Sequence, residues 1–396
     1  MAEPKVRFTR ENGSEYPIWR KKRLRDVCSL VGERGRGSGY LGTENMLPDF
    51  AGVDFSSERL GNGTVFGIGD VLISNIRPYL KKTWKADKSG VCSTDILVFH
   101  ANNVTEGYLY QIISNDSFIK YVMSAAKGSK MPRGDKDHML DMELFVPCLE
   151  EQQKIADFLS SVDDVISTSE QEVTNLETQK KAVMKKIFSQ EVRFKRADRS
   201  DFPEWEQKYL GDVVGNITSV KRIHAEDWRD SGIPFYRARE IVALYNKEPI
   251  SPLFIDEELY ENFSAVSGKI QPGDLLVTGV GTIGVPYLVK HGDKFYFKDG
   301  NIIWIQNNGN IDGPFLYALY GTPDLMNQLI IMSGKGTVHT YTIENAKKTV
   351  IPVPCLEEQR LIADFLSDFD EAIAAAKKEL ELWKELKKGL LQQMLV

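Results

Sequence analysis

Two long stretches of the chain share one pattern of apolar and polar positions. In Leu149–Phe188 and again in Leu356–Met394, apolar residues recur in alternating steps of four and three. This spacing is typical of the seam of a coiled coil, in which each helix presents an apolar stripe to its neighbour. The predicted seam residues are Ile155, Leu159, Val162, Ile166, Val173 and Leu176 in the first stretch, and Ile362, Leu366, Phe369, Ile373, Leu380 and Trp383 in the second.

One buried face of an ordinary core helix is the alternative interpretation of this pattern. The period of about 3.5 residues persists, however, for roughly five heptads, which is long for a core helix. Both stretches also interrupt the apolar seam with a lysine in the same layer, Lys180 and Lys387. We therefore predict two related coiled-coil helices.

Both helices open with identical residues. Pro-Cys-Leu-Glu-Glu-Gln occupies positions 147–152 and again 354–359. Glutamates in the first turn and lysines in the last turns complement the dipole of each helix. These signals indicate where the helices begin and end.

The repetition continues outside the helices. The matching segments are 7–27 with 193–213, 69–73 with 273–277, 95–98 with 301–304, 108–110 with 315–317, and 127–128 with 335–336. Similar segments that recur in the same order along the chain indicate a duplicated structural unit. The predicted division is a globule at 1–148, a helix at 149–192, a second globule at 193–354 and a second helix at 355–396.

Each globule mixes strand and helix signals. The predicted strands are 65–73, 94–99 and Glu143–Val146 in the first globule, and 274–278, 294–297, Ile302–Gln306 and 349–353 in the second. Helices are predicted at 107–127 and 314–332, each interrupted midway. The fold class is therefore α+β, with two duplicated α/β domains separated by two long helices.

Connectivity predicts how the helices pair. Only residues 189–192 separate the first helix from the second globule. The seam of the second helix needs a partner, and the first helix supplies one if the two run antiparallel. The two halves would then be related by a pseudo-twofold axis, with the globules held about 60 Å apart by helices of about 40 residues.

Length and composition set broad limits. A chain of 396 residues is typical of two or three domains. No apolar run is long enough to span a membrane, and the first residues are charged, so we expect a cytoplasmic protein. The four cysteines form no Cys-x-x-Cys pair, and those at positions 148 and 355 are expected to be small buried side chains.

Motifs for catalysis and cofactor binding are weak. Residues 279–284 match Gly-x-Gly-x-x-Gly, but Pro286 and an extended pattern follow where a dinucleotide fold needs a helix. The matching loop in the first half, 75–80, has no glycine. No methyltransferase tetrapeptide, P-loop, nucleophile elbow or metal-ligand spacing occurs, so we expect a non-catalytic protein without a metal site.

Basic and aromatic residues recur instead in matched loops. Such residues contact phosphates and base edges, although an ordinary solvated surface is the alternative for any one of them. Because the net charge is −6, DNA binding would depend on local patches. The candidates are Arg77, Tyr79, Lys81, Lys82, Trp84, Lys130, Arg133, Lys136 and His138 in the first half, and Lys221, Arg222, Arg237, Arg239, Thr278, Thr282, Lys335, Thr337, His339 and Tyr341 in the second.

These features together resemble the specificity subunit of type I restriction–modification enzymes. The resemblance rests on the helix openings, the Gly-Asp-(Val/Leu)-Leu-(Ile/Val) strands, the segment 130–136 (Lys-Met-Pro-Arg-Gly-Asp-Lys) and the doubled plan. It implies two target-recognition domains, each reading half of a split double-stranded DNA sequence, and two antiparallel helical spacers. Catalysis would then lie in partners, namely two methyltransferase subunits that use S-adenosylmethionine and restriction subunits that use ATP and Mg.

One departure between the halves concerns the candidate DNA-contact loop. Residues 131–134 read Met-Pro-Arg-Gly, whereas 338–341 read Val-His-Thr-Tyr. We therefore expect the two half-sites to differ in sequence, although the letters themselves depend on loop geometry.

Two rival functions remain at this stage. A protein-only coiled-coil scaffold or adaptor would bind proteins through its globules and would retain no DNA. A standalone modification enzyme is disfavoured by the missing motifs and would itself transfer methyl groups from S-adenosylmethionine.

Overall fold

The computed structural model describes residues 4–55, 59–334 and 340–395. Contacts divide the chain into two compact units: unit 1 comprises Met1–Glu172 and Ala376–Val396, and unit 2 comprises Val173–Ala375. Each unit therefore contains one globule and one half of each long helix. The predicted boundaries cut the chain where a globule passes into a helix, whereas the units divide each helix near its middle.

Unit 1 contains two four-stranded sheets, one of order β2-β9-β6-β7 and one of order β3-β5-β8-β4. The strands are β2 (Cys28–Leu30), β9 (Ile96–Ala101), β6 (Val71–Ser74) and β7 (Thr83–Lys85), then β3 (Arg34–Gly37), β5 (Gly61–Phe66), β8 (Gly90–Cys92) and β4 (Tyr40–Leu41). A separate antiparallel pair joins β1 (Arg20–Arg23) to β10 (Glu143–Val146). The helical elements are η1 (Leu24–Asp26), η2 (Pro78–Leu80), α1 (Glu106–Ile113), α2 (Asp116–Ser124) and α3 (Lys136–Leu140).

Unit 2 repeats the framework with a different insertion. Its sheets have the orders β12-β18-β15-β16 and β14-β13-β17, and β11 pairs with β19. The strands are β11 (Glu206–Tyr209), β12 (Asn216–Thr218), β13 (Ile233–Tyr236), β14 (Leu253–Ile255), β15 (Leu275–Thr278), β16 (Pro286–Leu288), β17 (Tyr296–Phe297), β18 (Ile302–Gln306) and β19 (Val350–Val353). The helical elements are α5 (Leu210–Val213), η3 (Ala225–Asp227), α6 (Ala238–Tyr245), α7 (Glu257–Ser267), α8 (Gly313–Tyr320), α9 (Pro323–Met332) and α10 (Ile343–Lys347).

The duplication is visible in the order of elements along the chain. The sheet β2-β9-β6-β7 corresponds strand for strand to β12-β18-β15-β16. A pair of helices follows β9 in unit 1 (α1 and α2) and β18 in unit 2 (α8 and α9). The two units differ between β2 and β6 and between β12 and β15. There unit 1 inserts strands β3, β4 and β5, whereas unit 2 inserts β13, β14 and three helical segments.

One predicted strand is wrong. The apolar run 65–73 was predicted as a single strand, but β5 ends at Phe66 and β6 begins at Val71, in a different sheet. A turn separates them, because Gly69 has a φ of 88° and the Asp70 carboxylate accepts a 2.7 Å hydrogen bond from the Gly67 amide. Glycine tolerates this left-handed conformation, and the aspartate closes the turn.

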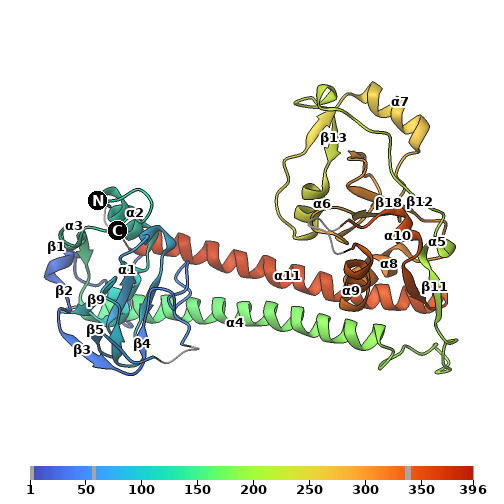
Figure 1. The fold of residues 1–396 in the computed structure, drawn as a ribbon. Coiled ribbons are helices and arrows are strands. Elements are labelled where there is room, and N and C mark those ends of the chain that lie inside the picture. Colours follow the sequence, from blue (N-terminus) through green and yellow to red (C-terminus); the bar gives the residue numbers. More distant parts are fainter. Residues whose placement is uncertain (1–3, 56–58, 335–339, 396) are drawn as a thin grey trace. The chain divides into compact units, whose positions relative to one another are not determined.

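The long helices α4 (Leu149–Phe188) and α11 (Leu356–Met394) have the predicted bounds (Figure 1). In unit 1, Lys387 of α11 pairs with Asp163 of α4 at 2.5 Å, and Lys384 pairs with Glu170 at 2.9 Å. Residue numbers rise along α11 as they fall along α4, so the helix halves in this unit run antiparallel.

The same arrangement recurs in unit 2. Lys180 of α4 pairs with Asp370 of α11 at 2.6 Å, and Ile187 shares a core with Ile362. Each lysine that interrupts the apolar seam therefore meets an aspartate of the other helix. A polar residue in a seam favours one register over its alternatives, at some cost in stability.

The seam residues lie inside, and some of them do more than join the helices. Ile155 and Leu159 belong to the core of unit 1, and Ile362 and Leu366 belong to the core of unit 2. The first turns of each helix are thus packed into a globule as well as against the other helix. Val162, Val173, Ile373 and Leu380 are also buried, and Ile166, Leu176, Phe369 and Trp383 are half-buried.

Candidate nucleic-acid interface

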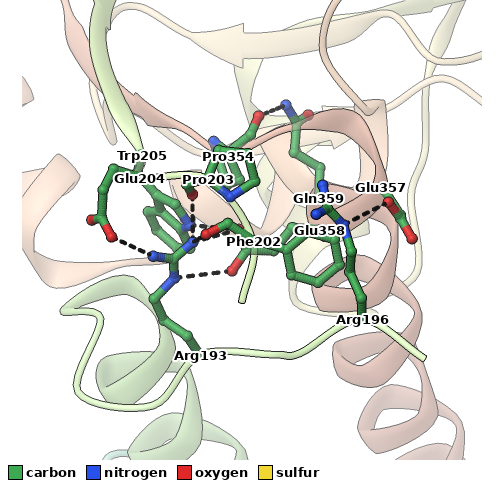
Figure 2. Close-up of polar contacts among 10 residues, drawn as sticks. All are labelled: Arg193, Arg196, Phe202, Pro203, Glu204, Trp205, Pro354, Glu357, Glu358 and Gln359. Carbon is green, nitrogen blue, oxygen red and sulfur yellow. Dashed lines mark hydrogen bonds and ion pairs between the residues drawn. The ribbon is translucent and has the colours of Figure 1, made fainter. Parts of the chain in front are cut away.

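The start of each long helix holds a buried carboxylate. Figure 2 shows Glu358 of α11, which accepts hydrogen bonds from the Trp205 indole at 2.9 Å and from Arg193 at 3.0 and 3.2 Å. The pKa of the Arg193 guanidinium is raised, mainly by the hydrogen bond to Glu358. A buried carboxylate is tolerated only when it is paired and hydrogen-bonded in this way.

Unit 1 contains the same cluster. Glu151 accepts hydrogen bonds from the Trp19 indole at 2.9 Å and from Arg7 at 2.9 and 3.1 Å. In both units the arginine also binds backbone carbonyls of the segment before the tryptophan. The cluster therefore ties the first segment of each globule to the start of a long helix.

The glutamine that ends each opening motif has an equally structural role. Gln359 donates to the Pro354 carbonyl at 2.7 Å and accepts from the Asp312 amide at 2.8 Å. Asp312 is the N-cap residue of α8. Gln152 makes the matching contacts with Pro147 and Thr105, the N-cap of α1. The repeated motif therefore positions helices and does not form a ligand site.

In unit 1, two loops predicted to contact DNA lie together. The Arg77 amide donates to the Pro132 carbonyl at 2.8 Å, and the Asn75 amide donates to the Asp95 carbonyl at 2.8 Å. The second loop is closed on itself, because Lys127 and Arg133 exchange two backbone hydrogen bonds of 2.9 Å. The 75–80 and 127–134 loops thus form one connected surface.

Glycine is required at the join between these loops. A Cβ on Gly134 would lie 2.1 Å from the Met139 methyl and 3.0 Å from the Asn75 side-chain oxygen. Met131, at the tip of the closed loop, is 50% exposed and was not among the predicted residues. An exposed large apolar side chain between lysine and arginine was the signal that could have identified it.

The predicted residues of unit 1 divide into three groups. Arg77, Tyr79, Lys130, Arg133 and Lys136 are exposed, and Arg133 also pairs with Asp95 at 3.0 Å. Three others are partly engaged: Lys81 pairs with Asp116 at 2.9 Å, Lys82 donates to the Thr43 carbonyl, and His138 stacks on Tyr121 at 4.1 Å. Trp84 is the exception, because it is 8% exposed and packs edge-on against Phe55 and Phe66 in the core. We therefore remove Trp84 from the candidate contacts.

In unit 2, several strand ends meet at one edge. β13 and β17 are parallel, so their carboxyl ends lie together, and the Lys298 amide donates to the Tyr236 carbonyl at 2.8 Å. β15 ends where β18 begins, and the Gly279 amide donates to the Asn301 carbonyl at 2.8 Å. The Tyr341 amide completes the edge by donating to Gly279.

This edge is the counterpart of the surface in unit 1. Asn75 and Gly279 occupy matched positions, and each donates to the residue that begins the facing strand segment, Asp95 or Asn301. In both units the loop also pairs with the segment before the last short helix, through bridges 76–133 and 280–340. Two loops distant in sequence are therefore brought together in the same way twice.

Several predicted residues of unit 2 lie at this edge. Arg222 pairs with Asp299 at 2.8 Å, and Lys221 lies 4.1 Å from the centre of the Phe263 ring. Arg237 and Arg239 both bind Glu240, and Thr282 is exposed. Lys335, Thr337 and His339 lie outside the described residues.

Two predicted residues of unit 2 are buried supports. The Thr278 hydroxyl donates to the Thr282 carbonyl at 2.5 Å and accepts from the Val285 amide at 2.9 Å, which closes the glycine-rich loop. Tyr341 is 1% exposed, and its hydroxyl lies 2.7 Å from that of Thr349. We remove both from the candidate contacts, because their polar groups are satisfied inside the fold.

The glycine-rich loop 279–284 has a packing explanation. A Cβ on Gly279 would lie 2.7 Å from the Tyr341 carbonyl oxygen, and Gly284 has a φ of 77°. Strand β16 follows the loop, where a dinucleotide-binding fold would have a helix. The loop therefore allows close approach of two backbones.

Unit 1 also has a groove of about 1130 Å³ between the globule and both long helices. Tyr110 and Gln111 of α1 line one side, and Asp157, Asp164 and Lys388 line the other. The Gln111 side-chain oxygen is buried and has no hydrogen-bond partner among the described residues. Unsatisfied buried oxygens are uncommon, but this one has almost no accessible surface and so does not open into the groove.

In unit 2, the matching face of α8 is covered in part by Tyr245. The ring of Tyr245, at the end of α6, lies 6.4 Å from that of Tyr317, the counterpart of Tyr110. Burial raises the pKa of both Tyr110 and Tyr317 to about 12. The two units thus use this face differently.

Metal, cysteine and membrane features add little. Within the described ranges, no three His, Cys, Asp or Glu side chains gather as a metal site, and no helix has the length and apolar content to span a membrane. All four cysteines are free. Cys28 and Cys92 are buried, and burial raises the pKa of both thiols to about 12. Cys148 and Cys355, expected to be buried, are half-buried.

Comparison with known proteins decides the family. A family model described as the type I restriction modification DNA specificity domain matches residues 9–178 and again 203–382. The chain belongs to this family. Its two matches divide the chain as the internal repeat does, and both include the start of a long helix.

Relatives and solved structures agree with this assignment. The type I restriction enzyme MjaVIII specificity subunit of Methanocaldococcus jannaschii is 28% identical over 330 residues, covering 78% of this chain and 74% of its own. A putative specificity subunit of Haemophilus influenzae is 31% identical over 190 residues, covering 45% of this chain and 46% of its own.

Two solved structures share the fold. The crystal structure of the S subunit from M. genitalium superposes with a TM-score of 0.59 at 16% identity, covering 100% of this chain and 99% of that one. A chain from a study of complex assembly and conformational transition of a type I R-M system gives a TM-score of 0.61 at 18% identity, covering 96% and 97%.

Proposed function

We propose that this specificity subunit reads a two-part DNA sequence, with one globule on each half and the helix pair setting the gap. The observation that carries the proposal is the repeated surface, in which matched loops meet through matched backbone hydrogen bonds in both units. Exposed arginine and lysine side chains on it supply phosphate and base contacts. Because much of the affinity would come from phosphates, it should fall steeply with salt.

The helices act as a spacer in this proposal. An α-helix rises about 1.5 Å per residue, so helices of 40 and 39 residues extend for about 60 Å. At about 3.4 Å per base pair, a spacing of about 50–60 Å would put the centres of the half-sites roughly 15 to 18 base pairs apart, or fewer if the globules lean inward. The loops would then determine the sequence of each half-site, and the helices would determine the gap between the half-sites.

The chemistry would belong to partner chains. Two methyltransferase subunits would bind S-adenosylmethionine and methylate adenine, and restriction subunits would use ATP and Mg. The chain itself would remain non-catalytic and would need no cofactor.

Co-expression with a methyltransferase chain encoded beside this one, followed by mapping of methylated adenines, tests the proposal. The expected result is one split sequence with a constant gap. Absence of methylation, together with no retention of DNA at any salt concentration by the assembled complex, would instead support the protein-only scaffold.

A further inference from the structure

A buried glutamate binds two arginines near the edge of unit 2 where the ends of β13, β15 and β17 lie. Glu240, in the first turn of α6, is only 2% exposed. Its carboxylate accepts hydrogen bonds from the Arg237 amide at 2.9 Å, from Arg237 Nε and Nη2 at 3.1 and 2.7 Å, and from Arg239 Nε at 2.7 Å. Burial by itself raises the pKa of this carboxyl, but the arginine hydrogen bonds bring the net pKa below its ordinary value.

The two arginines differ in how much of each guanidinium remains available. The Arg237 side chain is 21% exposed and binds Glu240 through two nitrogens, so it serves to neutralise the buried charge. The Arg239 side chain is 65% exposed and is held through Nε alone. Among the described residues, the hydrogen bond of the Arg239 side chain is the one from Nε to Glu240, and its two Nη atoms make none. The pair therefore leaves one oriented, outward-facing donor group.

The position of α6 places this group beside the candidate DNA surface. Arg237 directly follows β13, whose end is bonded to Lys298 at the shared edge, and Asp299 beside it holds Arg222. Helix α6 also packs against β15 and β16, the strands that flank the 279–284 loop. Among the described residues between β2 and β6, unit 1 has no helix, so this feature is found in unit 2.

An arginine fixed at Nε with both terminal nitrogens free matches guanine. Guanine presents two acceptors, O6 and N7, side by side in the major groove, whereas adenine replaces one of them with a donor. Bidentate pairing requires the guanidinium plane to be set in advance, which a buried carboxylate does. We propose that Arg239 reads a guanine in the half-site of unit 2, and that Glu240 is the positioning residue for it. This inference rests on the proposed function.

The test uses the subunit assembled with its methyltransferase chain and maps methylated adenines for the wild type, Arg239→Ala, Arg239→Lys and Glu240→Gln. One position in one half-site should lose its preference for guanine by about tenfold or more in both Arg239 variants. The other half-site and the gap should not change. Glu240→Gln should relax the same position to a smaller extent, which a purely structural defect would not do.

The control is Arg229→Ala, because Arg229 is an exposed arginine of unit 2 that pairs with Asp256 at 2.9 Å. It should leave the sequence unchanged. If complexes with Arg239→Lys and Arg239→Ala methylate the same target sequence as the wild type, even at a lower rate, the inference is overturned and Arg239 is a phosphate contact. A wild-type target without guanine in either half would also overturn it. Failure of the wild-type complex to methylate any split sequence would instead refute the proposed function.

Discussion

Unit 1 and unit 2 share a framework but differ in the surface built on it. Both have the buried Arg–Trp–Glu cluster, the glutamine that accepts a hydrogen bond from the N-cap residue of a globule helix, and the lysine–aspartate pair in the seam. Between β2 and β6 unit 1 adds strands, whereas between β12 and β15 unit 2 adds α6, α7 and a second small sheet. The shared framework orients globule and helix, and the side chains proposed to contact DNA lie on matched loops of different sequence and, in unit 2, also on the added helix α6.

The largest effect should come from changing the helices and leaving both surfaces intact. Inserting one heptad in both α4 and α11, at the middle where the units divide, adds about 10 Å and so about three base pairs to the preferred gap. Mapping of methylated adenines should show the same two half-sites at the new spacing and loss of methylation at the original one. Changed half-sites at an unchanged gap would show that the roles of helices and globules were assigned incorrectly.

Breaking one of the paired clusters should destabilise its own unit. Glu358→Ala leaves the Trp205 indole and the Arg193 guanidinium without their buried acceptor, and Glu151→Ala does the same in unit 1. Loss of one partner of a buried ion pair costs about 3–5 kcal/mol of unfolding free energy. Denaturant titration measures this, with Glu357→Ala as control. Glu357 lies beside Glu358 but is exposed, so its loss should stay within about 0.5 kcal/mol.

A single methyl group should disturb the surface of unit 1 without touching unit 2. Gly134→Ala would place a Cβ against Met139, Val122 and Asn75, and overpacking of this kind costs about 1–3 kcal/mol. Recognition of the unit 1 half-site should weaken, as measured by methylation of oligonucleotides altered in either half. Gly389→Ala is the matched control: nothing lies within 4 Å of its Cβ, and the helix should gain up to about 1 kcal/mol.

The smallest effect concerns the seam pairs. A double-mutant cycle on Asp163 and Lys387, both less than one-third exposed, should give a coupling of about 1 kcal/mol. The equivalent cycle on Asp370 and Lys180 should give less, because Asp370 is 48% exposed. Thermal unfolding of the single and double alanine variants measures both. Equal couplings, or none, would show that exposure does not control the strength of these pairs.

Apolar periodicity was sufficient to predict the long helices and the framework strands at 143–146 and 302–306, and repeated residues were sufficient to predict the duplication. These features follow from local spacing of apolar residues and from repeated letters, which do not depend on the rest of the fold. The prediction of one strand at 65–73 was wrong because a turn of four residues interrupts an otherwise continuous apolar pattern. The sheets of the insertions were missed because their short strands carry little periodic signal.

The candidate surface shows the same limit more clearly. Sequence could identify loops rich in basic and aromatic residues, but it could not show that Trp84 is buried, since a tryptophan with its apolar body and polar N–H occurs both in cores and at surfaces. Nor could it show that Glu240 is buried or that the Gln111 side-chain oxygen lacks a partner among the described residues, because burial depends on the packing of distant segments. The heptads and the repeat were determined by the order of residues along the chain, whereas tertiary packing alone decided which side chains remain free to bind.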